Sequence, residues 1–134
     1  IEVKAEFCAA HAILLRGVRE PVHGHNWRVT ATIAGENLDQ DGLLCDFHAL
    51  ESVLAQVIAP FNNADLNHTP PFTDLNPSAE HVARFIATQL AARLDPTLAP
   101  NARVASVRVT EAPGCSTTYF TRPNPGHAVK ASNP

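Results

Sequence analysis

An α+β fold, with a four-stranded antiparallel sheet covered on one face by two helices, is the architecture that this sequence predicts. Two stretches of apolar and polar alternation open the chain, two amphipathic helical stretches follow, and a hairpin pattern comes last. The predicted order is therefore strand, strand, helix, helix, strand, strand. Such a two-layer arrangement buries the apolar face of the sheet against the helices.

The two N-terminal stretches have the period of a β-strand. Residues 1–11 place apolar side chains at odd positions, ending at His11, while even positions up to Cys8 are polar or charged. Residues 25–33 repeat the pattern with the same parity. If residues 12–22 connect the stretches as antiparallel neighbours, the end of the first lies beside the start of the second.

Three histidines meet in this arrangement. His23 and His25 are one residue apart, so their side chains project from the same face of a strand, and His11 ends the neighbouring strand. Three neutral imidazoles suit zinc, and three protein ligands leave a fourth position for water or substrate. The spacing predicts a catalytic zinc site at these histidines, with a chance clustering of histidines as the alternative.

Two helices are predicted in the middle of the chain. Asp46 can cap a helix whose apolar residues recur every three or four positions until Pro60 ends it. A second helix is expected to open at Asn76-Pro77 and to end near Asp95-Pro96. Residues 61–76, rich in Asn, Pro and Asp, predict an irregular loop between them.

The third and fourth strands are expected at residues 103–111 and 116–121, joined by a Pro-Gly turn. The apolar residues of the third strand share one face: Ala105, Val107 and Val109. Glu111 prolongs this row instead of facing water. Such a carboxylate is either paired with a structural partner or held for a ligand with polarised N–H groups.

Length and composition favour a single domain. The chain has 134 residues, and we expect the domain to span residues 1–121, followed by a mobile tail at 122–134. A net charge of −3 argues against a nucleic-acid partner, and no apolar run is long enough to cross a membrane. Three scattered cysteines fit a reduced, cytoplasmic setting.

Six motifs occur in one order along the chain: Phe7-Cys8-Ala9-Ala10-His11, His23-Gly24-His25-Asn26-Trp27, Asp46-Phe47-His48-Ala49-Leu50, Leu66-Asn67, Asn76-Pro77-Ser78-Ala79-Glu80 and Val109-Thr110-Glu111. With these motifs the chain resembles, from about residue 3 to 120, the 6-pyruvoyltetrahydropterin synthase and 6-carboxytetrahydropterin synthase family. The resemblance implies the tunnelling fold, or T-fold. In that fold three subunits close their sheets into a barrel, two such rings stack into a hexamer, and active sites lie at subunit interfaces.

The resemblance also implies functional roles. His11, His23 and His25 would bind Zn²⁺, and Glu111, with Thr110 beside it, would anchor the pterin ring through its N–H groups. The implied enzyme is a zinc-dependent carbon-oxygen lyase. Its implied substrate is the small molecule 7,8-dihydroneopterin triphosphate, used in queuosine, folate or biopterin synthesis.

The chain departs from the family pattern where the proton-transfer residues belong. Arg19 occupies the position of the usual catalytic cysteine, four residues before His23. Asn62-Asn63 occupies the position of the Asp-His pair that activates this cysteine, and amide side chains do not titrate in a useful range. The usual relay is therefore missing.

Three hypotheses remain for the chemistry. Glu20, in Glu20-Pro21-Val22-His23-Gly24-His25, resembles the base of a glutamate-bearing branch that releases 6-hydroxymethyl-7,8-dihydropterin for folate synthesis. Alternatively, Asp65 and His68 replace the missing pair from shifted positions in the same loop. In the third hypothesis, the protein is a zinc and pterin binding module without proton chemistry.

Overall fold

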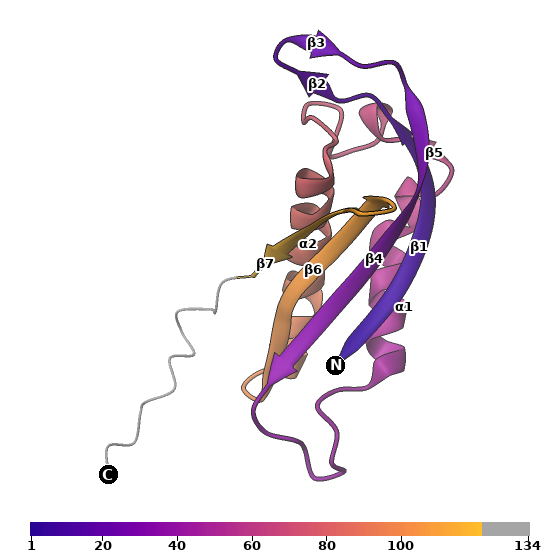
Figure 1. Cartoon of the computed structure of the whole chain (residues 1–134). Helices are drawn as coiled ribbons and strands as arrows, with labels where there is room; N and C mark the ends of the chain where they lie inside the picture. Colours follow the sequence, from indigo (N-terminus) through magenta and orange to yellow (C-terminus); the bar gives the residue numbers. More distant parts are fainter. Residues whose placement is uncertain (122–134) are drawn as a thin grey trace.

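The structure, a computed structural model, describes residues 1–121, and the tail expected at 122–134 lies outside the described residues. One sheet has the strand order β5-β1-β4-β6-β7, and helices α1 and α2 cover one of its faces (Figure 1). The strands are β1 (Glu2–His11), β4 (His23–Gly35), β5 (Ala64–Asp65), β6 (Ala102–Ala112) and β7 (Cys115–Phe120). The helices are α1 (Phe47–Ile58) and α2 (Ala79–Leu98). The α+β class is confirmed.

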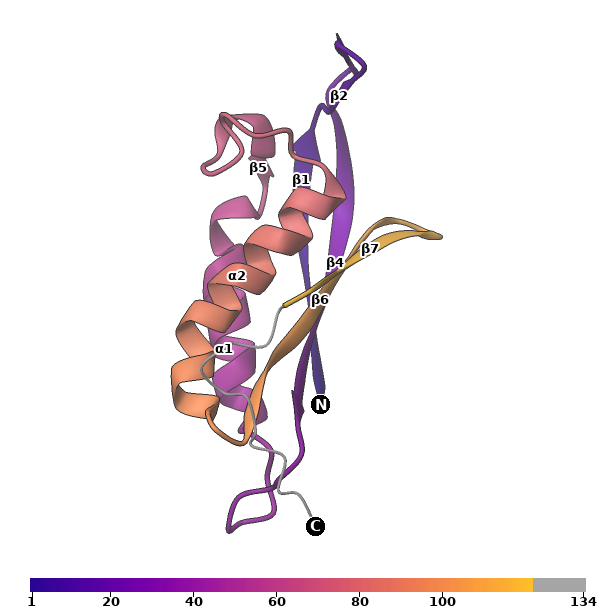
Figure 2. The same ribbon diagram turned by 90° about the vertical axis from the view of Figure 1, so that its left-hand side faces the viewer.

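The pairing of the first two long strands is as predicted. β1 and β4 run antiparallel, with His11 opposite His23 and Phe7 opposite Trp27. Phe7 and Trp27 are buried, and their rings stack with centroids 5.9 Å apart. The odd-numbered face of both strands packs on the helices, so the shared parity places the histidines on the helix side of the sheet (Figure 2).

The prediction of a purely antiparallel, four-stranded sheet is wrong. The short strand β5 adds to the edge of β1 in parallel orientation, which makes a mixed sheet of five strands. The loop that contains β5 is held beside β1 because Asn63 donates its backbone N–H to the Cys8 carbonyl at 2.6 Å. Asn63 adopts a positive φ of 58°, which asparagine tolerates better than most residues.

The connection between β1 and β4 forms a second, two-stranded sheet. It consists of β2 (Leu14–Leu15) and β3 (Val18–Arg19), which pair antiparallel. Arg16 and Gly17 both have positive φ, as the favoured two-residue hairpin turns require. This hairpin projects beyond the end of the main sheet, above the histidine end of β1 (Figure 1).

The structure confirms the cap of the first helix and corrects the limits of the second. Asp46 accepts a hydrogen bond from the His48 backbone N–H at 2.8 Å. The α2 cap is Ser78 and not Asn76, whose side chain is bound elsewhere. α2 also continues past Pro96 to Leu98, because the proline falls in its last turns, where an unpaired carbonyl can be solvated. No helix within residues 1–121 has the length and apolar character needed to span a membrane.

A β-bulge corrects the expected core face of β6. Thr32 pairs with Ser106 and Ile33 pairs with Val104, so Ala105 is an extra residue without a partner on β4. The inward positions therefore change parity at this point. Val104 is buried in place of Ala105, while Val107, Val109 and Glu111 keep the expected face.

Candidate active site with a metal centre

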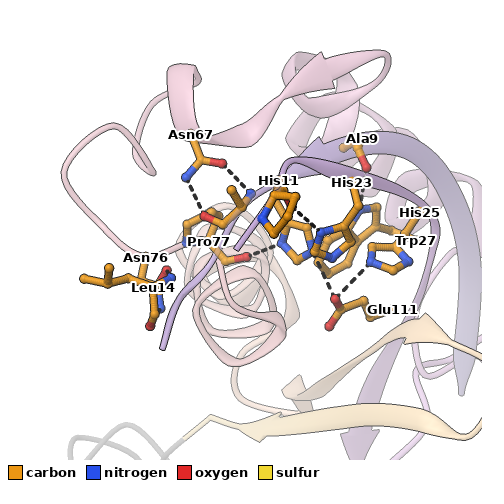
Figure 3. Close-up of polar contacts among 12 residues, drawn as sticks. Ala9, His11, Leu14, His23, His25, Trp27, Asn67, Asn76, Pro77 and Glu111 are labelled. Atoms are coloured by element: carbon orange, nitrogen blue, oxygen red, sulfur yellow. Dashed lines mark hydrogen bonds and ion pairs between the residues drawn. The ribbon is translucent and has the colours of Figure 1, made fainter. Parts of the chain in front are cut away.

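Four side chains converge on the helix side of the sheet, where β1 and β6 end and β4 begins. The ring centroids of His11, His23 and His25 lie 4.7 to 5.2 Å from one another. One possible ligand atom from each histidine and one Glu111 carboxylate oxygen all lie within 4.8 Å of one another (Figure 3). Such a set can hold one metal ion.

Backbone carbonyls orient two of the three rings. His11 Nδ1 lies 2.8 Å from the Pro77 carbonyl oxygen, and His23 Nδ1 lies 2.9 Å from that of Pro21. A carbonyl oxygen can only accept, so each Nδ1 carries the hydrogen and each Nε2 of the neutral ring keeps a free lone pair. Backbone carbonyls orient metal-binding histidines in the same way in other metal sites.

The Nε2 atoms of His11 and His25 are buried and have no hydrogen-bond partner within residues 1–121. Burial lowers the pKa of His25, and the neighbouring His11 and His23 lower it further, while Glu111 opposes the shift. A neutral imidazole is the form that binds a metal ion. Buried ring nitrogens that make no hydrogen bond and face one carboxylate oxygen are therefore explained by a metal ligand set.

Trp27 forms the wall behind the histidines. Its ring lies edge-on to His11 and His25, with centroid distances of 4.9 and 5.7 Å. The indole N–H donates to the Ala9 carbonyl at 3.2 Å, and Trp27 is fully buried. The rings of the cluster are thus packed on a fixed surface, which limits their rotation.

Glu111 reaches the same cluster from β6. Its Oε1 lies 3.0 Å from His11 Nε2 and 3.1 Å from His25 Nε2, and its side chain is 23% exposed. Thr110, its neighbour, instead lines a hollow of about 300 Å³ on the sheet face away from the helices, with Lys4 and Arg28. The structure therefore brings Glu111, but not Thr110, to the histidines.

Glu20 follows β3 and lies three residues before His23. It is half-buried, and its backbone N–H donates to the Ile13 carbonyl at 3.0 Å. Its carboxylate makes no hydrogen bond or ion pair with any residue of the described part of the chain. Arg19 donates to the Ala12 carbonyl at 3.4 Å and lines a separate hollow of about 500 Å³ beneath the hairpin.

Asp65 and His68 form a hydrogen-bonded pair in the loop after α1. His68 Nδ1 lies 2.9 Å from Asp65 Oδ2, and both residues line the same hollow as Arg19. The histidine side chain is 83% exposed, so this pair faces solvent. Asn62 and Asn63, at the usual position of such a pair, instead hydrogen-bond the backbone of Cys8.

Two asparagines that sequence reasoning did not assign to the site hold the segment after His11. Asn67 binds both the N–H and the carbonyl of Ala12, at 2.7 and 2.9 Å. Asn76 binds the N–H and the carbonyl of Leu14 in the same way, at 2.8 and 3.2 Å (Figure 3). Both asparagines stand in motifs shared with the family, which was the available signal.

Comparison with known proteins identifies the family of this chain. A sequence profile of a family described as 6-pyruvoyl tetrahydropterin synthase matches residues 1–122. The chain belongs to this family. The 6-pyruvoyl tetrahydropterin synthase family comprises pterin-processing enzymes, and the resemblance expected from the motifs is thereby confirmed.

Relatives and solved structures support the assignment. A putative 6-carboxy-5,6,7,8-tetrahydropterin synthase of Archaeoglobus fulgidus is 31% identical over 68% of this chain and 75% of that protein. The 6-carboxy-5,6,7,8-tetrahydropterin synthase of Bacillus subtilis is 32% identical over 82% of this chain and 74% of that protein. The structure of Caenorhabditis elegans 6-pyruvoyl tetrahydropterin synthase matches with a TM-score of 0.77 at 20% identity, over 91% of this chain and 94% of that one. The fold is therefore that of this synthase family.

Proposed function

We propose that this protein is a zinc-dependent lyase that acts on 7,8-dihydroneopterin triphosphate, with His11, His23 and His25 as the metal ligands. The observation that carries the proposal is the orientation of the rings. Carbonyls hold the Nδ1–H groups of His11 and His23, so their Nε2 atoms are free to bind a metal together with His25. A bound zinc ion would supply a Lewis acid that lowers the pKa of hydroxyl groups on the substrate's side chain.

Glu20 is the residue that we propose as general base, because Arg19 replaces the usual cysteine. Half-buried and close in sequence to His23, it can accept a proton from the substrate's side chain. Plasmodium vivax 6-pyruvoyltetrahydropterin synthase has been solved with a glutamate, described as a catalytic residue, changed to alanine or cysteine. A glutamate base favours 6-hydroxymethyl-7,8-dihydropterin as the product.

The Asp65 and His68 pair supports a second candidate for the base. The pair is formed, but His68 is largely exposed and shares its hollow with Arg19. We propose that this exposed pair faces the site of a neighbouring copy when several chains assemble. Exchange of His68 therefore belongs in the same experiment as exchange of Glu20.

The test is a product assay with the zinc-loaded protein and 7,8-dihydroneopterin triphosphate, followed by separation of the pterins. Glu20→Gln should lower turnover by 10²-fold or more, on the order of a lost general base, while one zinc per chain is retained. Glu36→Gln, an exposed glutamate at the other end of β4, is the matched control and should keep full activity.

The products separate the hypotheses. A hydroxymethyl product supports the glutamate-type reaction, and a pyruvoyl or carboxy product supports the usual family reaction with a different base. Loss of turnover in His68→Gln, with Glu20→Gln active, would assign the base to the Asp65 and His68 pair. Tight pterin binding with unchanged substrate would make the protein a binding module and would overturn the proposed activity.

A further inference from the structure

We infer that Glu111 is a fourth, exchangeable ligand of the metal centre, which closes the site before substrate binds and leaves it when a pterin ring occupies the carboxylate. The inference rests on the proposed function for the identity of the three histidine ligands. It adds that Glu111 occupies the fourth coordination position of the metal ion when no pterin is bound.

The position of the carboxylate carries the first step. Glu111 Oε1 is almost equally distant from His11 Nε2 and His25 Nε2, at 3.0 and 3.1 Å. The Pro77 carbonyl holds the Nδ1–H group of His11, so the Nε2 atom of His11 directs a lone pair, and not an N–H group, at this oxygen. A carboxylate oxygen and imidazole lone pairs that face one common space are the donor set of a metal ion with three nitrogen ligands and one oxygen ligand.

The backbone of β6 gives Glu111 freedom to exchange. Thr110 pairs with Ser116 and Ala112 pairs with Cys115, so Glu111 is an extra residue without a partner on β7. The pairing of β6 with β4 also stops at Thr110. Beyond this point, the hairpin of β6 and β7 turns away from β4 (Figure 2). A bulge at the end of a ladder directs a side chain without fixing it in a regular sheet.

The chemistry of the ligand carries the last step. A pterin ring offers adjacent N–H donors that suit both oxygens of one carboxylate. A carboxylate held by two such hydrogen bonds is a weaker metal ligand. Binding of the pterin ring by Glu111 and binding of the metal ion by Glu111 therefore compete with each other. The metal would thus gain its open position only when a pterin is present, which links substrate selection to activation.

Cobalt substitution tests this inference without turnover. Protein loaded with one Co²⁺ per chain should show the visible bands of a four-coordinate site, and these bands should shift on addition of unsubstituted pterin, which lacks a side chain to bind the metal. Glu111→Gln and Glu111→Ala should show the shifted spectrum without pterin. Both variants should also bind Co²⁺ on the order of tenfold more weakly.

Controls separate the possible failures. If Glu111→Gln gives the wild-type spectrum and the wild-type Co²⁺ affinity, Glu111 is not a ligand and the inference is overturned, while the zinc site stands. If pterin shifts the spectrum of Glu111→Gln as much as that of the wild-type protein, the ring itself binds the metal, and the inference is also overturned. A wild-type protein that binds no Co²⁺ overturns the proposed metal site instead. Thermal unfolding of each variant shows that the fold is intact.

Discussion

His11 and His23 are both proposed as metal ligands, but they lie in different environments. His11 is completely buried and bonded to the Pro77 carbonyl, whereas His23 is exposed and bonded within its own strand end. A buried side chain that satisfies a carbonyl contributes to folding even without metal. Substitutions at these two positions can therefore distinguish an effect on metal binding from an effect on stability.

We expect His11→Ala and His23→Ala both to lose zinc, since each removes one of three nitrogen ligands. In the metal-free state, His11→Ala should lower the free energy of unfolding by about 2 kcal/mol, because the Pro77 carbonyl loses its donor and a cavity remains. His23→Ala should change it by less than about 0.5 kcal/mol. Urea unfolding in the presence of a chelator measures the free energy of unfolding of both variants. An equal decrease in the two variants would contradict the stabilising role assigned to the buried His11.

Cys45 provides a pH-dependent prediction away from the site. Partial burial raises the pKa of its thiol, and the adjacent Asp46 raises it further, while the chain's amino terminus opposes the shift. A raised pKa means that less thiolate is present at any given pH, so alkylation should become fast only at higher pH. Iodoacetamide labelling at pH 8 with mass spectrometry should modify the exposed Cys8 and Cys115 first, and earlier labelling of Cys45 would contradict this.

At the scale of elements, the segment that runs from the end of β1 into the hairpin depends on side chains from a distant loop. Asn67 and Asn76 each bind one residue of this segment through a donor and an acceptor, as a neighbouring strand would. The Ile13 carbonyl between them accepts from the Glu20 N–H. The two amides thereby position the proposed base relative to the histidines.

Asn67→Ala should lower the free energy of unfolding by about 1 to 3 kcal/mol. Two hydrogen bonds are lost, and the partly buried N–H and carbonyl of Ala12 are left without these partners. It should also lower kcat more than it raises KM, because Glu20 loses its fixed position while the pterin contacts remain. Asn37→Ala, an exposed asparagine at the other end of the molecule, is the control. Equal stability and kinetics of the two variants would exclude a positioning role.

At the scale of the whole molecule, the sheet has edges that one chain does not cover. Within residues 1–121 no strand pairs with the outer edge of β7, and β5 covers β1 only at Ala9 and Ala10. Large apolar side chains are exposed on the hairpin, in the segment after it and on β7: Leu14, Leu15, Val18, Val22 and Phe120. Open edges and apolar patches of this kind favour assembly, and a homo-oligomer, trimer or hexamer, is the state that we propose.

Sedimentation velocity at micromolar concentration should show a mass of at least three chains. Phe120→Lys should weaken this assembly, because the side chain is 71% exposed in the isolated chain and its replacement puts a charge on the edge strand. Leu38→Lys, at a side chain that is 62% exposed in the loop after β4, should leave the assembly unchanged. A monomeric wild-type protein would contradict the proposal.

The histidine cluster was predictable because period-two alternation determines which side chains share a face of a strand. The parity of residues 1–11 and 25–33 predicted the pairing of His11 with His23, and the structure has that register. The bulge at Ala105 was not predictable in this way, since one extra residue reverses the face without leaving a mark in the apolar pattern. The cap at Ser78 was missed because Asn76, an equally good capping residue, is bound to Leu14.

The sequence by itself determined the α+β class, the order of the two helices and of β1, β4, β6 and β7, the family and the three histidines that face one another, since these depend on periodicity and on residues close along the chain. The tertiary structure decided which groups surround them: the Pro77 carbonyl that orients His11, the asparagines that hold the segment before Glu20, and the contact of Glu111 with two imidazoles. Such contacts join residues up to about a hundred positions apart. They depend on how strand ends, bulges and loops meet in space, and no local pattern contains that information.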